Sequence, residues 1–329
     1  MGDFQESLSA SIVIPAYNAA RTIKQCVEAC LAQDYPHLEI VVVDDGSTDE
    51  TEDILRDYPI CYVKQENAGP ASARNRGWRA AAGEVICFTD SDCVPAADWV
   101  SRLLKEYAAK DVAGVGGTYD IANSNSLLAS CIHEEIVQRH LKMPKYVNYL
   151  GSFNASYRRD LLEQVGGFDE SYRTASGEDN DLAYRIAKLG NKLVFTCDSR
   201  VAHYHPDHLW SYLRHQFWHG YWRMKLYRDH RDMTKGDAYA GWADFLQVPL
   251  ALATLCLVPF GFVPVIAWLI ALLVGLSFLL QLPLLWAILK RSRRIKYVAL
   301  APIVFLRSYA RGMGTVLGVL RFVFSARSV

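Results

Sequence analysis

The sequence lacks the patterns that mark several common protein classes. Its eight cysteines form no CxxC pair and no Cys/His group with zinc spacing, so no zinc module is indicated and a reducing compartment is expected. Lysine plus arginine and aspartate plus glutamate both number 35, which argues against an overall electrostatic attraction to nucleic acid. The phosphate-loop pattern G-x-x-x-x-G-K-[ST] and internal repeats are also missing.

A secretory leader is not visible either, because the first apolar run, residues 10–16, is short and contains Pro15. We therefore expect the N-terminal domain to remain in the cytosol. Long apolar runs occur only toward the C-terminus, at Phe245–Phe262 and Val265–Leu289, and each is long enough to cross a bilayer. Proline and glycine at residues 259–264 separate the two runs, which predicts a two-span hairpin.

The segments around this hairpin carry positive charge. Basic residues precede the first span and recur at residues 290–296, so both ends of the hairpin are predicted to face the cytosol. The apolar stretch 297–324 contains Arg307 and Arg311 one turn apart, which favours an interfacial helix over a third span. Residues 208–231 mix aromatic and basic side chains, as in a helix at the lipid headgroups. Single-stranded nucleic acid also binds such mixtures, but the apolar run that follows favours the membrane.

Strands and helices alternate through the first ninety residues. The predicted strands are 11–17, 39–43, 60–65 and 84–89, and the predicted helices are 21–33, 48–57 and 71–82. Ser47 and Glu50 form a plausible capping box for the second helix. This alternation predicts a mostly parallel, Rossmann-like α/β sheet with flanking helices, which binds ligands beyond the carboxyl ends of its strands.

The pattern after residue 100 is mixed. Predicted helices are 103–109, 124–143, 159–165 and 179–189, and predicted strands are 114–119, 154–157 and 192–196. We therefore predict three parts: a catalytic domain over 1–205, an amphipathic interfacial segment over 206–240 and a membrane domain over 241–329.

Three acidic clusters are the residues best suited to chemistry. Asp90-Ser91-Asp92 closes a predicted strand, and carboxylates two residues apart there can converge on Mg²⁺ or Mn²⁺. Taken alone, such a cluster is more often a polar turn, and the same holds for Asp44-Asp45-Gly46. Acids at 178, 179 and 181 precede a helix. Capping alone does not account for three of them in four positions.

In order and spacing, six motifs resemble the family 2 glycosyltransferases, which have the GT-A fold. The resemblance covers roughly residues 8–205. Its motifs are Ile12–Asn18 (IVIPAYN), Val41–Asp49 (VVVDDGSTD), Asn67–Gly77 (NAGPASARNRG), Asp90–Asp92 (DSD), Gly166–Asp169 (GGFD) and Glu178-Asp179 (ED). One such motif would be weak evidence, whereas six in series are specific.

The resemblance implies a role for each matching residue. In the implied donor site, the nucleobase is surrounded by Pro15, Ala16, Tyr17 and Asp45. The rest of the nucleotide and its diphosphate lie by Arg74, Asp90 and Ser91. Asp90 and Asp92 would hold Mn²⁺ or Mg²⁺, completed by His203, with His205 as a competitor. Asp179 would be the general base, with Glu178 beside it. A divalent metal would neutralise the diphosphate leaving group, and one base suffices for direct, inverting displacement.

One departure from the family bears on the product. Processive members carry Gln-x-x-Arg-Trp before their membrane helices, whereas Gln216 here has no Arg-Trp at that offset. We therefore expect transfer of a single sugar, with a processive polysaccharide synthase as the alternative. A non-catalytic nucleotide-sugar-binding scaffold and a nucleotidyltransferase remain alternatives from other classes.

The predicted function is thus a hexosyltransferase-like enzyme of cell-envelope polysaccharide synthesis. It would use a nucleotide sugar, with UDP favoured by Asp45, and an acceptor that is a lipid or a lipid-linked saccharide. It would reside in the inner or plasma membrane with its catalytic domain in the cytosol.

Overall fold

The computed structural model describes residues 8–232 and 241–324. The chain divides into two compact units, each described by itself below. The first comprises residues up to Ala122 together with Met143–Tyr204, and the second comprises Asn123–Lys142 together with the residues from His205 onward. The ends of the predicted segment 206–240 and of the predicted membrane domain 241–329 lie outside the described residues.

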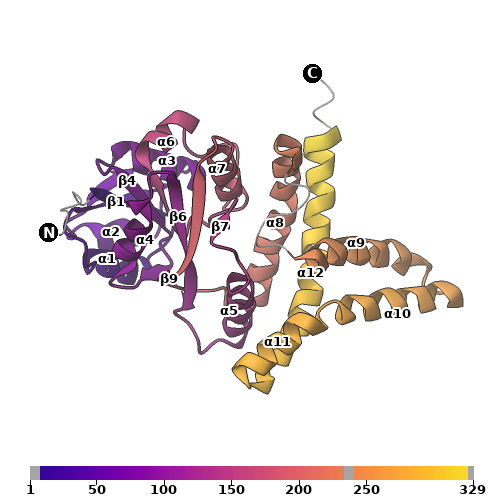
Figure 1. The fold of residues 1–329 in the computed structure, drawn as a ribbon. Helices are drawn as coiled ribbons and strands as arrows, with labels where there is room; N and C mark the ends of the chain where they lie inside the picture. The colour runs from indigo at the N-terminus through magenta and orange to yellow at the C-terminus, as the bar shows by residue number, and fades with distance from the viewer. Residues whose placement is uncertain (1–7, 233–240, 325–329) are drawn as a thin grey trace. The chain divides into compact units, whose positions relative to one another are not determined.

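The first unit is an α/β sheet with helices on both faces (Figure 1). Its strands are β1 (Ala10–Ala16), β2 (Leu38–Asp44), β3 (Cys61–Lys64), β4 (Val85–Thr89), β5 (Cys93–Pro95), β6 (Val112–Ile121), β7 (Tyr146–Val147), β8 (Asn154–Arg158) and β9 (Lys192–His203). Its helices are α1 (Ile23–Leu31), α2 (Thr51–Leu55), α3 (Pro70–Ala80), α4 (Trp99–Lys105), α6 (Arg159–Val165) and α7 (Glu178–Ala187). The sheet order is β3-β2-β1-β4-β8-β6-β9-β5, and β7 pairs with β9.

The predicted mostly parallel sheet is confirmed. Strands β1 to β4 are mutually parallel, as are β6 and β9, whereas β8 runs antiparallel between β4 and β6. The continuous β-branched runs of β1 and β2 form strands because both faces are covered. On one face, Ile23 of α1 and Trp99 of α4 are fully buried, and on the other, Ala73 of α3 and Leu182 of α7 are.

The predicted capping box of the second helix is wrong. Helix α2 begins at Thr51, three residues later than predicted, and Glu50 precedes it without a side-chain cap. Ser47 is engaged elsewhere, because its hydroxyl accepts the Asn18 N–H at 2.9 Å. Asp49 accepts the Thr51 N–H at 3.1 Å instead, so an aspartate turn replaces the predicted serine cap.

The second unit is helical. It contains α5 (Leu127–His140), α8 (Leu209–Asp229), α9 (Trp242–Leu257), α10 (Pro264–Leu279), α11 (Leu282–Ser292) and α12 (Leu300–Val319). Helices α8 and α12 lie side by side (Figure 1). The predicted helix 124–143 is α5, and it packs with α11 and α12 in this unit, although its position in the chain lies inside the predicted catalytic domain.

The long apolar helices differ in detail from the prediction. Within the described residues, three segments are long and apolar enough to cross a membrane: Ala243–Phe260, Pro264–Ser292 and Ile295–Phe324. The second contains two helices rather than the single one predicted over Val265–Leu289. The first of these ends at Leu279, because Pro283 lacks an N–H and its ring would clash with the carbonyl four residues earlier. The third segment, predicted as interfacial, is long enough to span by length and composition.

Candidate functional site

The carboxyl ends of β1, β2 and β4 meet at one edge of the sheet, because the three strands are parallel neighbours. Ala16 pairs with Asp44 in the register, so the residues that follow both strands emerge together. Of the predicted base-pocket residues, Pro15 is half-buried, Ala16 is buried and Tyr17 is 52% exposed. This edge therefore presents the side chains that the sequence assigned to the donor.

Asp45 is buried, and its carboxylate is held by the chain itself. One oxygen accepts from Gln65 Nε2 at 2.7 Å and from the Ala68 N–H at 2.9 Å, and the other accepts from the Gly69 N–H at 2.9 Å. Gly69 has φ of +95°, a left-handed conformation that side-chain-bearing residues rarely adopt. Asp45 thus orders the loop before α3, and the sequence analysis, which assigned it to the nucleobase, did not foresee this.

Arg74 joins two of the acidic motifs. From α3 its guanidinium donates to Asp90 Oδ1 at 2.7 Å and to Glu178 Oε1 at 2.9 Å. The Arg74 side chain is 2% exposed, so this cation is shared between the end of β4 and the start of α7 away from bulk water. Burial lowers its pKa, but the two carboxylates raise it by more, and the guanidinium stays charged.

Glu178 has a pKa raised above the ordinary glutamate value. Burial raises its pKa, the neighbouring Asp179 carboxylate raises it further and Arg74 opposes both, with a net result of about 7. Among the described residues, Glu178 Oε2 and Arg74 Nε are buried polar atoms without a hydrogen-bond partner. The cluster therefore holds more polar capacity than the chain alone satisfies, as is expected of a ligand site.

Helix α7 begins directly at this cluster. Gly177 precedes it with φ of +94°, and no side chain caps the N-terminus. Asp181 is buried and forms an ion pair with Arg185 of the same helix at 2.8 Å. Asp179 is half-buried beside Glu178, and its Oδ1 accepts the N–H of Asn180 at 2.8 Å. The three acids of this first turn therefore have three different environments.

Asp92 lies beside His203. His203 Nε2 is 3.4 Å from Asp92 Oδ2, and the backbone reinforces the pair, because Tyr204 N–H donates to Asp92 O at 2.9 Å. Strand β5 pairs with β9 so that Cys93 opposes His203, and this register brings the two side chains together. Burial lowers the pKa of His203, but the Asp92 charge raises it by more. The sequence predicted neither β5 nor the extension of β9 beyond residue 196.

The residues at this point fit a divalent cation. Asp92, Cys93 and His203 present ligand atoms within 4.8 Å of one another. Burial raises the pKa of the Cys93 thiol well above its usual value, so the neutral sulfur is a poor donor to a hard cation. A carboxylate oxygen and an imidazole nitrogen remain, with Asp90 two residues away. His205, the competing histidine, lies in the second unit, where its N–H bonds Asn123 Oδ1 at 3.1 Å.

Asn75 is a supporting residue that the sequence analysis missed. Its amide donates to Phe168 O and to Glu170 Oε1, both at 2.8 Å, and its oxygen accepts from the Phe168 N–H at 2.8 Å. The amide thus ties α3, which carries Arg74, to the turn that precedes α7. The only signal in the sequence is the position of Asn75 next to Arg74 in the N-A-G-P-A-S-A-R-N-R-G motif, which does not reveal its partner.

Comparison with known proteins identifies this arrangement. The sequence profile described as "Glycosyl transferase family 2" matches residues 11–166, the stretch that holds Asp45, Arg74 and the Asp90–Asp92 motif. Residues 11–166 of the chain thus match glycosyltransferase family 2. The site residues Asp45, Arg74, Asp90 and Asp92 therefore lie within the matched stretch. Glu178, Asp179 and His203 come after its end.

Two curated relatives of the chain are named as glycosyl-transferring enzymes. The "Glycosyltransferase AglE" of Haloferax volcanii is 30% identical over 197 residues, which is 57% of this chain and 64% of that protein. The "Glucosyl-dolichyl phosphate glucuronosyltransferase" of the same organism is 27% identical over 242 residues, which is 65% of this chain and 76% of that protein. The chain covers less than two thirds of the length of several curated relatives: 64% of AglE, and 30% and 64% of two others.

A solved structure shares the fold along nearly the whole chain. The mannosyltransferase PcManGT from Pyrobaculum calidifontis, described in complex with GDP-Man and Mn²⁺, matches with a TM-score of 0.60 and 21% identity. The match covers 96% of this chain and 88% of PcManGT. This similarity confirms the GT-A fold predicted for the chain.

Proposed function

We propose that the protein transfers one sugar from a nucleotide-sugar donor to a lipid or lipid-linked saccharide acceptor, with inversion at the anomeric carbon. The observation that carries this proposal is the bridge from Arg74 to Asp90 and Glu178, because it joins the predicted metal motif to the predicted base motif. The adjacent Asp92–His203 pair supports the same function. The family match supports glycosyl transfer as the reaction class.

For the donor, we assign the diphosphate to the motif of Asp90, Ser91 and Asp92, which would hold it through Mn²⁺ or Mg²⁺. Asp92 and His203 would be the main ligands of this cation. A bound divalent cation would supply Lewis-acid neutralisation of the charge that develops on the leaving diphosphate. Arg74 holds the Asp90 carboxylate in place, at 2.7 Å from its Oδ1.

The nucleobase would lie by Pro15, Ala16 and Tyr17, with Asp45 ordering the adjacent loop. We retain a UDP sugar as the favoured donor, and because PcManGT is described with GDP-Man, guanosine donors belong in the same test.

For the acceptor hydroxyl, we assign Asp179 as general base. Glu178 has a pKa of about 7 and is committed to Arg74, so we assign it to positioning and to setting the local charge. The half-buried Asp179 carboxylate beside Glu178 would be suited to taking a proton as attack proceeds. The inverting outcome follows from the use of one base without a covalent intermediate.

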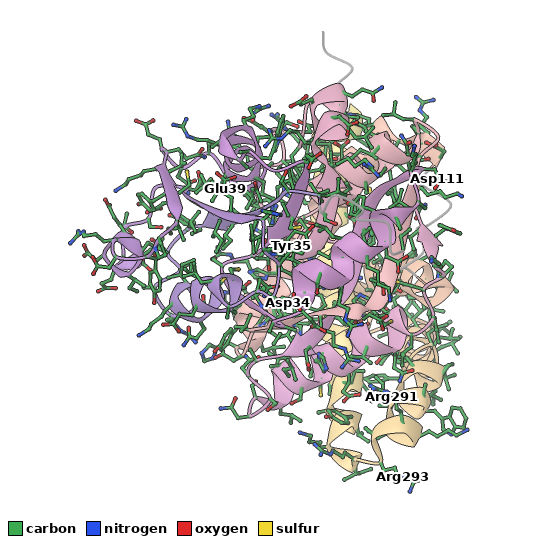
Figure 2. All side chains as sticks on the ribbon, turned by 60° about the vertical axis from the view of Figure 1, so that its left-hand side comes forward. Asp34, Tyr35, Glu39, Asp111, Arg291 and Arg293 are labelled. Carbon is green, nitrogen blue, oxygen red and sulfur yellow. The ribbon has the colours of Figure 1, made fainter. Side chains whose placement is uncertain are left out.

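A membrane location supports the acceptor assignment. Three helices are long and apolar enough to span a bilayer, and one curated relative is named for a dolichyl phosphate acceptor. Figure 2 shows Arg291 and Arg293 at the end of α11, where basic residues follow the second apolar segment. By the positive-inside rule, this turn would face the cytosol, and we propose that the catalytic unit does too.

The deciding experiment is a thermal-shift screen of UDP- and GDP-sugars with and without Mn²⁺, followed by transfer assays on lipid-linked acceptors. Selective, Mn²⁺-dependent stabilisation by one donor and formation of an elongated lipid product would support the proposal, because a ligand stabilises the state it binds. The matched variants are Asp92→Asn in the cluster and Asp98→Asn outside it, where the carboxylate pairs with Arg102 on the surface. Donor binding with unchanged turnover in Asp179→Asn would favour the non-catalytic scaffold instead.

The length of the product separates single transfer from chain polymerisation. One added sugar per acceptor supports the proposal, and a ladder of products would favour the processive synthase. Mass spectrometry of the lipid product reads both outcomes directly.

A further inference from the structure

The second unit contains a buried network of charged side chains that the proposed transfer reaction does not use. Glu135 of α5 accepts from Arg307 Nη1 of α12 through both oxygens, at 2.8 and 2.7 Å. Arg139 of α5 donates to both oxygens of Asp244 at the start of α9, at 2.6 and 2.9 Å. All four side chains are at most 14% exposed. Burial raises the pKa of Glu135, but Arg307 and Arg139 lower it by more, to about 2.

The network holds one cation more than its carboxylates can neutralise. Within the described residues, Arg139, Arg307 and Arg311 form ion pairs with two carboxylates, Glu135 and Asp244, and the first two arginines already bind both carboxylates by hydrogen bonds. Arg311 donates from Nε to the neutral Gln216 Oε1 at 2.7 Å, and its closest carboxylate oxygen is 4.0 Å away. Within residues 8–232 and 241–324, its terminal nitrogens donate no hydrogen bond. The guanidinium is thus hydrogen-bonded through one nitrogen, and the Arg311 side chain is 30% exposed.

The neighbouring face of α8 adds positive charge instead of removing it. His219 on α8 is close enough to Arg311 and Arg223 for their charges, after burial itself, to help lower its pKa to about 3. Gly220 lies against the Arg311 backbone, since a Cβ there would be 2.1 Å from Arg311 O. Arg307 Nε is also buried without a hydrogen-bond partner in the described chain. Arg311 of α12 and Arg223 of α8 thus both place positive charge near His219, where the two helices pack together.

A purely structural role does not account for this surplus. Arg307 and Glu135 form a pair that can tie α5 to α12, but Arg311 lies one turn further along an apolar helix that is long enough to span a membrane. Residues 245–329 contain no aspartate or glutamate that could balance it. An ionisable side chain in such a helix is costly, and its usual explanation is a bound ion, substrate or charged partner. A guanidinium with two free terminal nitrogens matches two phosphate oxygens.

We propose that Arg311, together with the cationic face of α8 around Arg223, binds the phosphate group of the lipid carrier on which the acceptor is built. The ligand is a phosphate mono- or diester attached to a long apolar chain. The phosphate would lie against Arg311, and the chain would lie along the exposed apolar surface of the same unit, where Met313, Val316 and Leu317 of α12 are 44–51% exposed. This inference rests on the proposed function, because it names the acceptor's anchoring group.

The test measures binding to the purified full-length chain in neutral detergent micelles. The three probes are a short polyprenyl phosphate, the corresponding polyprenol and inorganic phosphate. We expect the polyprenyl phosphate to bind at least tenfold more tightly than either other probe. Equal binding of the polyprenol would overturn the proposal, and equal binding of inorganic phosphate would identify a free-anion site instead of a lipid site.

Variants locate the site. Arg311→Gln should weaken polyprenyl phosphate binding at least tenfold, and Arg311→Lys should restore part of it, because charge returns without the planar fork. Arg321→Gln is the matched control, since Arg321 is an exposed cation on the same C-terminal helical segment. Wild-type affinity in Arg311→Gln contradicts the proposal. If Arg311→Gln does not fold, the Arg311→Lys variant and the wild-type preference for phosphate over alcohol still decide it.

The donor site provides an independent readout. Nucleotide-sugar binding, measured by thermal shift with Mn²⁺, should be the same in Arg311→Gln and in the wild type. If neither the wild type nor the variants bind a nucleotide sugar, this would count against the proposed transfer function. It would leave the proposed phosphate site untouched. Lost lipid binding with retained donor binding is the pattern expected if both proposals are correct.

Discussion

At the scale of single residues, Arg74 has the widest influence on the site. One guanidinium serves Asp90 and Glu178, which lie 88 positions apart in the sequence, and the fork geometry of arginine allows both bonds at once. Because Arg74 and Glu178 are both buried, the charge balance of the cluster depends on one side chain.

Arg74→Gln should therefore be among the most damaging substitutions in the first unit. Removing one partner of a buried charge pair costs about 3–5 kcal/mol of stability, because the remaining charges lose their compensation. We expect a lower unfolding temperature, loss of Mn²⁺-dependent donor stabilisation and loss of transfer. Arg74→Lys should recover stability better than activity. Arg76→Gln, an exposed arginine on the same helix, is the control and should match the wild type.

Glu178 predicts a pH dependence of stability. Its pKa is about 7 in the folded chain and near the ordinary glutamate value of about 4.5 when unfolded, so the folded state binds more protons between these values. The stability contributed by Glu178 is therefore fully present below about pH 4.5, falls as pH rises through about 7 and is constant above it.

Comparison with Glu178→Gln isolates this effect, because glutamine cannot ionise. The difference in unfolding temperature between wild type and variant should change with pH between about 4.5 and 7 and be flat above. Parallel curves across this range would show that Glu178 keeps an ordinary pKa. Glu163→Gln, an exposed glutamate of α6, should show no such change.

At the scale of elements, the β5–β9 pairing and the α8–α12 crossing decide the arrangement. The register that sets Cys93 opposite His203 also brings His203 next to Asp92. The sequence does not reveal this register, because β5 is only three residues long. Glycines allow α8 and α12 to approach closely: a Cβ at Gly314 would be 1.9 Å from Phe217 O, and one at Gly318 would be 2.5 Å from Tyr221 O.

His203→Ala should remove part of the metal response without unfolding the chain. The imidazole is partly exposed and contacts Asp92 at 3.4 Å, so its loss leaves no buried charge. We expect the Mn²⁺ concentration needed for donor stabilisation to rise about tenfold or more, as is typical when a metal site is weakened. His208→Ala, an exposed histidine, is the control. An unchanged Mn²⁺ titration in His203→Ala would remove this histidine from the proposed ligand set.

Gly314→Ala should disrupt the helix crossing. The added methyl group has no room at 1.9 Å from a backbone oxygen, so α8 and α12 must separate, which typically costs about 1–3 kcal/mol. Gly275→Ala on α10 is the matched control, because nothing lies within 4 Å of a Cβ there. A lower unfolding temperature in detergent for Gly314→Ala alone is the expected result. Equal stability of the two variants would mean that the helices do not pack this closely.

At the scale of the whole molecule, the two units differ in the surface that they expose. The first unit buries its apolar strands between two layers of helices. The second leaves large apolar side chains exposed, including Phe262, Val265 and Trp268 at 77–82%. Such a surface is stable only when something apolar covers it, and a lipid bilayer meets that requirement along three helices.

Membrane extraction tests this directly. We expect the chain to stay in the membrane pellet after washing with high salt and with alkaline carbonate, and to enter solution only with detergent. Salt release would indicate attachment through the basic residues 290–296 alone, since electrostatic binding is screened by ions.

The sequence by itself determined most of the strands, helices and apolar segments, because these follow from local periodicity and turn residues, but it did not reveal β5 or the division of the second apolar segment into two helices. Its motifs also indicated Asp90, Asp92 and Asp179 as site residues, since acidic residues at the end of a buried strand or the start of a helix are a local pattern. Only the tertiary structure decided which side chains contact one another. Asp45 holds a loop, Arg74 links Asp90 to Glu178 and Arg311 has no carboxylate at hydrogen-bonding distance. Such partnerships depend on distances between residues far apart in the chain, and Coulomb and hydrogen-bond energies depend on those distances and on burial, which no local pattern contains.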